Sequence, residues 1–174
     1  MIARDRIEAR FTGVFLMAKQ SAGLLMYRRR QGVAQVLLVH PGGPYWAKKD
    51  RGAWTIPKGE IEQGEGALAA ATREFEEETG FHPEGDFRPL NPVSLKSRKT
   101  VYAWTFEGDC NPCALKSISF LMEWPPHLGK EQEFPEVDRA EWFGLEEAKE
   151  KIQAGQMGFI EQFERIISEE EKGA

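Results

Sequence analysis

Residues 59–81 read GEIEQGEGALAAATREFEEETGF, and this stretch decides the fold. From residue 66 to residue 79 it has the alanine-rich interior of a helix, and Gly80 follows, a residue suited to the left-handed conformation that closes helices. Three apolar residues are spaced to share one face of that helix and are expected to pack against a sheet: Leu68, Ala71 and Phe75.

The end of this helix carries more negative charge than local stability favours. Glu74, Glu77 and Glu78 share one face, and like charges at that spacing destabilise a helix by about a few tenths of a kcal/mol per pair. They also lie near the helix C-terminus, where the dipole disfavours anions, and Arg73 is the only basic residue in the helix. Such carboxylates would bind a hard divalent cation. A solvated acidic face is the alternative interpretation.

The wider pattern resembles the Nudix box, G-x5-E-x7-R-E-U-x-E-E-x-G-U, in which U is a bulky apolar residue. Every fixed position is matched between Gly59 and Phe81, with Phe75 and Phe81 at the two apolar positions. The resemblance implies an α/β fold, the Nudix α/β/α sandwich with a mixed β-sheet. It also implies hydrolysis of a pyrophosphate bond in a nucleoside diphosphate linked to another group, dependent on Mg²⁺ or on Mn²⁺ in its place.

The resemblance assigns roles residue by residue. The Mg²⁺ ligands would be three carboxylates and one backbone carbonyl: Glu74, Glu77, Glu78 and Gly59. Arg73 would pair with Glu65 and keep the loop and the helix in register, which matches the need for residues that orient metal ligands. Two or more Mg²⁺ ions would bridge the diphosphate and activate water for in-line attack on phosphorus.

The general base stays open between two possibilities. It is one of the box carboxylates, Glu77 or Glu78, or a loop glutamate outside the box, as in several relatives. For the outside carboxylate we favour Glu136, with Glu133 second, because both lie where a loop enters the last predicted strand. The alternative is that these two glutamates are solvated loop charges.

Aromatic side chains near the box are candidates to stack on a nucleobase, which requires only a π-face. Two of these candidates, Tyr45 and Trp46, lie in a loop rich in glycine and proline, where Trp46 is expected to be exposed. Tyr102 is a further candidate, although packing in the core is the stronger interpretation of its position.

Three other polar residues are candidates for substrate contacts. Lys58, just before the box, and Lys99 could reach phosphates as mobile point charges. His40, at the end of a predicted strand, could line the site, but a lone histidine is more often structural.

Details of sequence favour one specificity. Three segments are similar to the diadenosine tetraphosphate hydrolase branch of the family: residues 54–59, 99–102 and 142–148. The tyrosine that this branch often carries downstream of the box is Arg98 here, which counts against it. The enzymatic alternative is a nucleoside triphosphate pyrophosphohydrolase acting on canonical or oxidised nucleotides. A nucleotide sensor with a Nudix fold and no turnover is the alternative of another class, although the box carboxylates are all kept.

The flanking sequence predicts the other elements. Aliphatic segments at 21–29 and 33–40 around Gln31-Gly32 predict a hairpin, and residues 41–53 a long loop. The remaining segments follow in order: strands near 88–95, 99–107 and 116–124, a loop from Pro125 to about Pro135, a strand at 137–143, and helices near 145–153 and 157–170. We expect residues 19–170 to form one Nudix domain. We expect residues 1–18 to be an N-terminal extension, either without fixed structure or created by a start assigned upstream of Met17.

Composition limits the partners. A net charge of -5 argues against a general nucleic-acid binder, whereas a metal ion can bring a small phosphorylated substrate into an acidic pocket. No apolar run is long enough to span a membrane, so we expect no membrane association, a cytoplasmic location, and a monomer or homodimer. Cys110 and Cys113 are expected to flank a turn, because the histidines are not in zinc-finger spacing.

Overall fold

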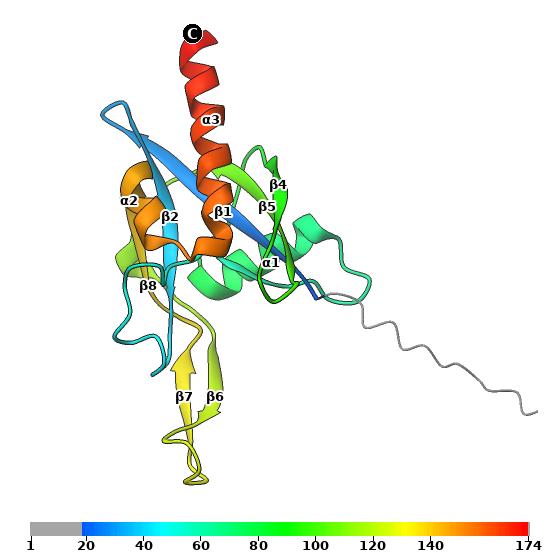
Figure 1. Ribbon diagram of the computed structural model, residues 1–174, viewed down its shortest axis with the longest axis vertical. Coiled ribbons are helices and arrows are strands. Elements are labelled where there is room, and N and C mark those ends of the chain that lie inside the picture. Colours follow the sequence, from blue (N-terminus) through cyan, green and yellow to red (C-terminus); the bar gives the residue numbers. More distant parts are fainter. Residues whose placement is uncertain (1–18, 174) are drawn as a thin grey trace, which may run out of the picture.

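The computed structural model describes residues 19–173 of the chain (Figure 1). The predicted extension at residues 1–18 lies outside this range. The elements are β1 (Gln20–Arg30), β2 (Val33–Pro41), β3 (Lys58–Glu60), α1 (Ala67–Thr79), β4 (Arg88–Ser94), β5 (Thr100–Glu107), the 3₁₀ helix η1 (Pro112–Ala114), β6 (Ser119–Glu123), β7 (Glu131–Pro135), β8 (Val137–Gly144), α2 (Leu145–Lys151), the 3₁₀ helix η2 (Ala154–Gln156) and α3 (Met157–Gly173). The predicted strands and helices occur in the expected order, and β3, β7 and two 3₁₀ helices are present in addition.

Six strands form one mixed sheet. Its order is β4-β5-β1-β2-β8, and β3 pairs with β1 outside this path. β1 runs parallel to β5 and antiparallel to β2 and β3. The predicted hairpin of β1 and β2 turns at Gln31 and Gly32, both with positive φ, as a two-residue turn matched to the twist of the strands requires.

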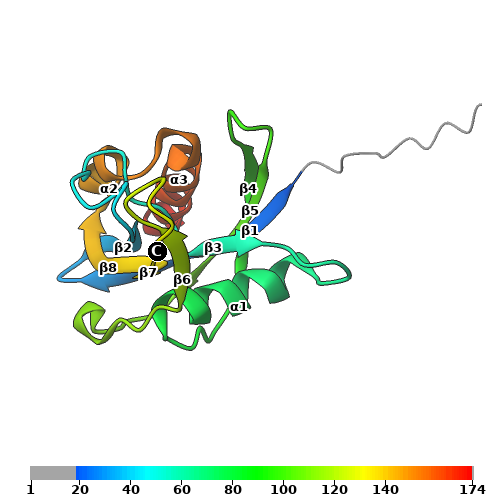
Figure 2. The same ribbon diagram turned by 90° about the horizontal axis from the view of Figure 1, so that it is seen from below.

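Helices cover both faces of the sheet (Figure 2). Alternate residues of β1 point to opposite faces, so Ala22 and Leu24 pack with α1 while Leu25 packs with α2 and α3. The two core clusters on these faces confirm the predicted α/β/α sandwich with a mixed sheet. None of the helices in residues 19–173 has both the length and the apolar composition of a membrane span.

Helix α1 ends as predicted, because Gly80 is left-handed with φ 74 and its backbone N–H bonds to the carbonyl of Glu76. Ala71 and Phe75 are fully buried, as expected. The prediction for Leu68 is wrong, since this side chain is 37% exposed. The buried stripe of the helix also contains Ala70 and Glu74, which places Leu68 at its border in the first turn.

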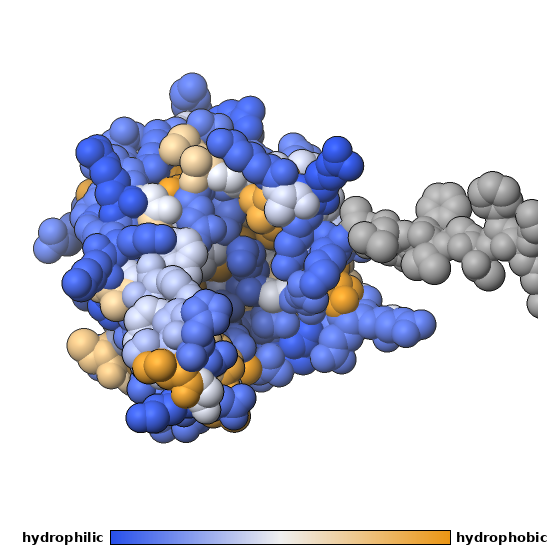
Figure 3. Space-filling model, turned by 60° about the horizontal axis from the view of Figure 1, so that its bottom comes forward, coloured by the Kyte–Doolittle hydropathy of each residue, from blue (hydrophilic) through white to orange (hydrophobic). Residues whose placement is uncertain are grey.

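β6 and β7 form a separate two-stranded sheet that projects from the body of the molecule (Figure 1). We call residues 119–135 the arm. The predicted loop reaching about Pro135 is therefore wrong, because residues 131–135 pair with β6. The strand is not evident from the sequence because three consecutive residues have charged or amide side chains and show no alternation of apolar and polar residues: Glu131, Gln132 and Glu133. On the side where the arm comes forward, the surface is hollowed beside it (Figure 3).

Between β5 and the arm the chain makes the turn expected around Asn111. The side-chain oxygen of Asn111 accepts a hydrogen bond from the backbone N–H of Cys113 at 3.1 Å. Cys110 and Cys113 flank this turn as free thiols. Trp142 of β8 donates its indole N–H to the Cys110 carbonyl at 3.2 Å, which holds the turn against the edge strand.

Candidate active site

Strand β3 brings the first residue of the box against the acidic end of α1. Gly59 lies opposite Ala22 of β1, on the sheet face that α1 covers. A Cβ at Gly59 would lie 2.0 Å from the carboxyl carbon of Glu74. The close contact between this carboxylate and the backbone of β3 therefore requires glycine.

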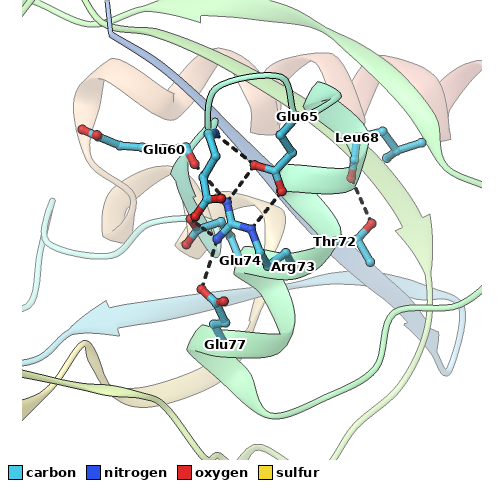
Figure 4. A network of polar contacts seen from close by, with 8 residues as sticks. Glu60, Glu65, Leu68, Thr72, Arg73, Glu74 and Glu77 are labelled. Carbon is cyan, nitrogen blue, oxygen red and sulfur yellow. Dashed lines mark hydrogen bonds and ion pairs between the residues drawn. The ribbon is translucent and has the colours of Figure 1, made fainter.

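Arg73 joins the loop before α1 to the helix (Figure 4). Its Nε and Nη2 each donate to one oxygen of Glu65 at 2.9 Å, and Nη2 also reaches the Glu60 carbonyl at 3.1 Å. Nη1 donates to Glu74 at 2.8 Å and to Glu77 at 3.2 Å. The bidentate bond from Arg73 lowers the pKa of Glu65 to about 2. The pair holds the loop on the helix, as the sequence leads us to expect.

Glu78 contacts the backbone of Lys58, the first residue of β3. Its Oε2 accepts a hydrogen bond from the backbone N–H of Lys58 at 3.0 Å. Burial raises the pKa of Glu78 to about 8, against the opposing effect of the Lys58 charge. Burial likewise lowers the pKa of Lys58 and raises that of Glu74.

Glu136 joins this group through a series of backbone hydrogen bonds. The Glu77 carbonyl accepts from Ile118 N–H at 2.9 Å, and the Ile118 carbonyl accepts from Glu136 N–H at 2.9 Å. The Glu136 carbonyl in turn accepts from Gly42 N–H at 2.8 Å. Burial and then the charge of Glu77 raise the pKa of Glu136. Glu133, its competitor, is exposed and lies opposite Leu121 on the arm.

Four glutamates thus form what we call the carboxylate cluster: Glu74, Glu77, Glu78 and Glu136. Burial, and to a smaller extent repulsion between the carboxylates, raises the pKa of Glu74, Glu78 and Glu136. Within residues 19–173 no three acidic, histidine or cysteine side chains are already arranged to hold a metal ion. Arg73 bonds to Glu74 and Glu77, and the Lys58 N–H bonds to Glu78. The donors are hard oxygens and fit a divalent cation of the Mg²⁺ type.

Basic side chains lie on the opposite sheet face from Gly59. Lys58 faces Gly23 of β1, and Glu60 two residues on binds Lys99 at 3.2 Å and Lys19 at 3.3 Å. The charge of Lys99 also contributes to the lowered pKa of Lys58. The site therefore has an acidic part and a basic part, separated by the short strand β3.

The aromatic candidates lie differently from what the sequence suggests. The expectation that Trp46 is exposed is wrong, because its ring is half-buried against the core and lies 4.6 Å from the Lys49 ammonium. The exposed neighbour is Tyr45, at 56%. Tyr102 is half-buried on the α1 side of the sheet, and its hydroxyl accepts from Gln20 at 3.5 Å, away from Lys58.

His40 is structural. The side chain is fully buried, with Nδ1 2.7 Å from an Asp138 oxygen and Nε2 2.8 Å from the Lys49 carbonyl. Its ring also packs against Trp54 with centroids 5.3 Å apart. Both ring nitrogens are thus bound by protein atoms, which favours the structural interpretation of His40 over the one in which it lines a substrate site. Sequence alone gives no signal for these partners.

Known proteins match most of the chain. The sequence model of the NUDIX domain family matches residues 17–163. The asymmetrical bis(5'-nucleosyl)-tetraphosphatase of Rattus norvegicus is 35% identical over 103 residues, which cover 52% of this chain and 66% of that enzyme, just under two thirds of its length. The enzyme of the same name from Mus musculus is 29% identical over 153 residues, 81% of this chain and 89% of that protein.

Solved structures share the fold. The binary complex of the C. elegans Ap4A hydrolase superposes with a TM-score of 0.58 at 23% identity, covering 87% of this chain and 98% of that one. The NUDIX domain of Shewanella oneidensis NrtR, complexed with ADP ribose, gives 0.62 at 18% identity, with 88% and 90% covered. Together with the family match over most of the chain, the box carboxylates and the sandwich fold show that this chain belongs to the NUDIX domain family.

Proposed function

We propose that this chain hydrolyses a pyrophosphate bond in a nucleotide derivative with the help of Mg²⁺, and that a dinucleoside tetraphosphate is its preferred substrate. The observation that carries the proposal is the carboxylate cluster at the end of α1, where Glu74 lies so close to Gly59 that a side chain would not fit there. The names of the rat and mouse relatives support the substrate class.

The chain's own residues would divide the work between them. Glu74, Glu77 and Glu78 would hold Mg²⁺, or Mn²⁺ in its place, which neutralises phosphate oxygens and lowers the pKa of a bound water. Arg73 keeps two of these carboxylates in position through its Nη1. Lys58 supplies a positive charge for a substrate phosphate from the other face of β3.

Glu136 is our choice for the general base. In this arrangement Glu77 bonds to Arg73 and Glu78 to the Lys58 N–H, whereas the Glu136 carboxylate makes no hydrogen bond to any residue in 19–173. Its raised pKa, caused by burial and the charge of Glu77, makes its carboxylate a stronger base than that of an ordinary glutamate. Glu136 would take the proton of the attacking water, while Glu77 and Glu78 serve as ligands.

Steady-state turnover of diadenosine tetraphosphate with Mg²⁺, resolved by chromatography, tests this assignment. Glu136→Gln should lower kcat by about 10²- to 10⁴-fold, the usual contribution of a general base. Glu133→Gln removes a carboxylate three residues away on the exposed side of the arm and should leave kcat unchanged. Equal losses in both variants, or none in Glu136→Gln, would exclude Glu136 as the base.

A panel of substrates tests the reaction itself. Release of ATP and AMP from diadenosine tetraphosphate, abolished by joint replacement of Glu77 and Glu78 with glutamine, supports the proposal. Preferential turnover of nucleoside triphosphates would keep the chemistry and replace the substrate. Nucleotide binding without turnover of any compound would instead indicate a sensor.

A further inference from the structure

The arm has two unlike faces. The outer face carries three exposed side chains, Leu121, Glu123 and Glu133. The inner face carries four half-buried side chains, three of them aromatic: Phe120, Met122, Trp124 and Phe134. The rings of Phe120 and Phe134 lie 6.2 Å apart across the two strands. A hairpin that pairs only with itself needs such a face to be covered.

The loop at residues 41–53 covers the inner face. A Cβ on Gly43 would lie 3.3 Å from the tip of the Phe120 ring. Trp46 N–H bonds to the Gly43 carbonyl at 3.2 Å, and this turn presents Tyr45 to solvent. The Tyr45 ring meets Trp124 edge-on, with centroids 5.3 Å apart and an interplanar angle of 81°. One face of the Tyr45 ring therefore stays available while Trp124 fixes the ring's orientation.

This aromatic pair lies close to the carboxylate cluster. Gly42 donates its N–H to the carbonyl of Glu136 at 2.8 Å, and a Cβ at Gly42 would lie 1.9 Å from the Pro135 carbonyl oxygen. Tyr45 follows Gly42 by three residues, so their Cα atoms are at most about 11 Å apart. That distance is comparable to the length of a nucleoside monophosphate. The hollow beside the arm is open to solvent (Figure 3).

We infer that Tyr45 and Trp124 form a nucleobase site, in which a base stacks on the Tyr45 ring and Trp124 acts as a positioning residue. The inference rests on the proposed function, which it deepens by assigning substrate specificity to the arm. Stacking requires a π-face rather than a particular hydrogen-bond pattern, so the site prefers large purine rings without reading one base. Trp46, half-buried against the core, has no part in it.

Kinetics with diadenosine tetraphosphate test the pair. Tyr45→Ala should raise KM at least about fivefold, because stacking on one base is worth about 1–3 kcal/mol and a tenfold change is about 1.4 kcal/mol. The value of kcat should stay within about twofold, since a base contact far from the reacting phosphorus stabilises ground and transition states alike. Tyr45→Phe keeps the aromatic face and should therefore have the KM of the unaltered protein. Trp124→Ala should raise KM as well, and Trp124→Phe should recover most of the loss.

The matched control is Leu121→Ala, on the opposite face of the arm and 66% exposed, which should change neither constant. Circular dichroism and thermal melting of each variant check that the fold is kept. A loss of kcat and melting temperature in Trp124→Ala that Trp124→Phe does not rescue would make Trp124 purely structural and overturn its role here.

A binding measurement separates this inference from the reaction. Calorimetry should show that AMP binds more tightly than ribose 5-phosphate, and that Tyr45→Ala removes this difference. Binding lost in that way, without turnover of any substrate, would support the base site while the proposed function fails. Normal turnover with KM and the AMP preference unchanged in Tyr45→Ala would overturn the base site and leave the proposed function intact.

Discussion

At Gly59 one hydrogen atom in place of a side chain decides where a carboxylate can lie. Gly59→Ala would insert a methyl group 2.0 Å from the Glu74 carboxyl carbon, so either the helix or the strand must shift. We expect kcat/KM to fall by about 10- to 100-fold, the usual effect of displacing the groups around a metal site. Gly66→Ala is the control, because its Cβ meets open space; steady-state kinetics of the two variants should differ.

The ion pair of Glu65 and Arg73 makes stability depend on pH. The pKa of Glu65 is lowered from 4.5 to about 2 because Arg73 bonds to its charged form. The unfolded chain therefore takes up the proton first, so the stabilisation is complete above pH 4.5 and is lost as pH falls toward 2. Urea unfolding should show the largest destabilisation by Glu65→Gln at neutral pH. A pH-independent difference would contradict this account.

The last turns of α1 hold Glu74, Glu77 and Glu78, and no basic residue lies in the last turn. A bound cation would relieve this repulsion, so removing Mg²⁺ with a chelator should lower the melting temperature. At a hundredfold excess over Kd the loss is about 2.7 kcal/mol, or about 5 °C or more. Glu78→Gln should lose most of the Mg²⁺ effect, whereas Glu76→Gln, whose carboxylate pairs with His82, should keep it.

The arm differs from the sheet in how it is held. Its two strands pair only with each other, whereas β1 lies between β5 and β2 and also pairs with β3. Because local opening follows the number of buried contacts, amides of residues 119–135 should exchange with solvent far faster than those of β1. Hydrogen exchange read by mass spectrometry measures this. Equal protection of the arm and β1 would mean that the arm opens only with the domain.

An element could be predicted from the sequence when its pattern is local, and could not when it depends on contacts with a distant segment. The box, the hairpin at Gln31 and the end of α1 at Gly80 depend on local spacing or backbone conformation, and all were predictable. β7 was not, because its one apolar side chain, Phe134, is recognised only beside Phe120.

The candidate site divides in the same way. Arg73 and Glu65 pair within the box, and the resemblance to the family implies this contact. His40 is held by Asp138, which lies 98 residues further along the chain. Trp46 packs against a core cluster that also contains residues distant in sequence, so neither contact could be recognised from local sequence. Contacts between distant segments therefore decide the positions of both Trp46 and His40.

Across the domain, the match to the NUDIX family model begins at residue 17. We therefore expect a chain that begins at Met17 to keep the fold, with a melting temperature within about 2 °C of the full chain, the scale of a change below about 1 kcal/mol. Calorimetry of both chains makes the comparison. Failure of the shortened chain to fold would show that residues 1–16 belong to the domain.

The hydrogen bonds that place Glu136 run through backbone atoms of Glu77, Ile118 and Gly42. Backbone groups are the same whatever side chain is attached, so the position of residue 136 does not depend on its own identity. Exchange of that side chain therefore alters reactivity without moving the scaffold. Position 136 is therefore suited to protein engineering, because the activities of variants with an acid, an amide or an imidazole side chain can be compared on the same backbone.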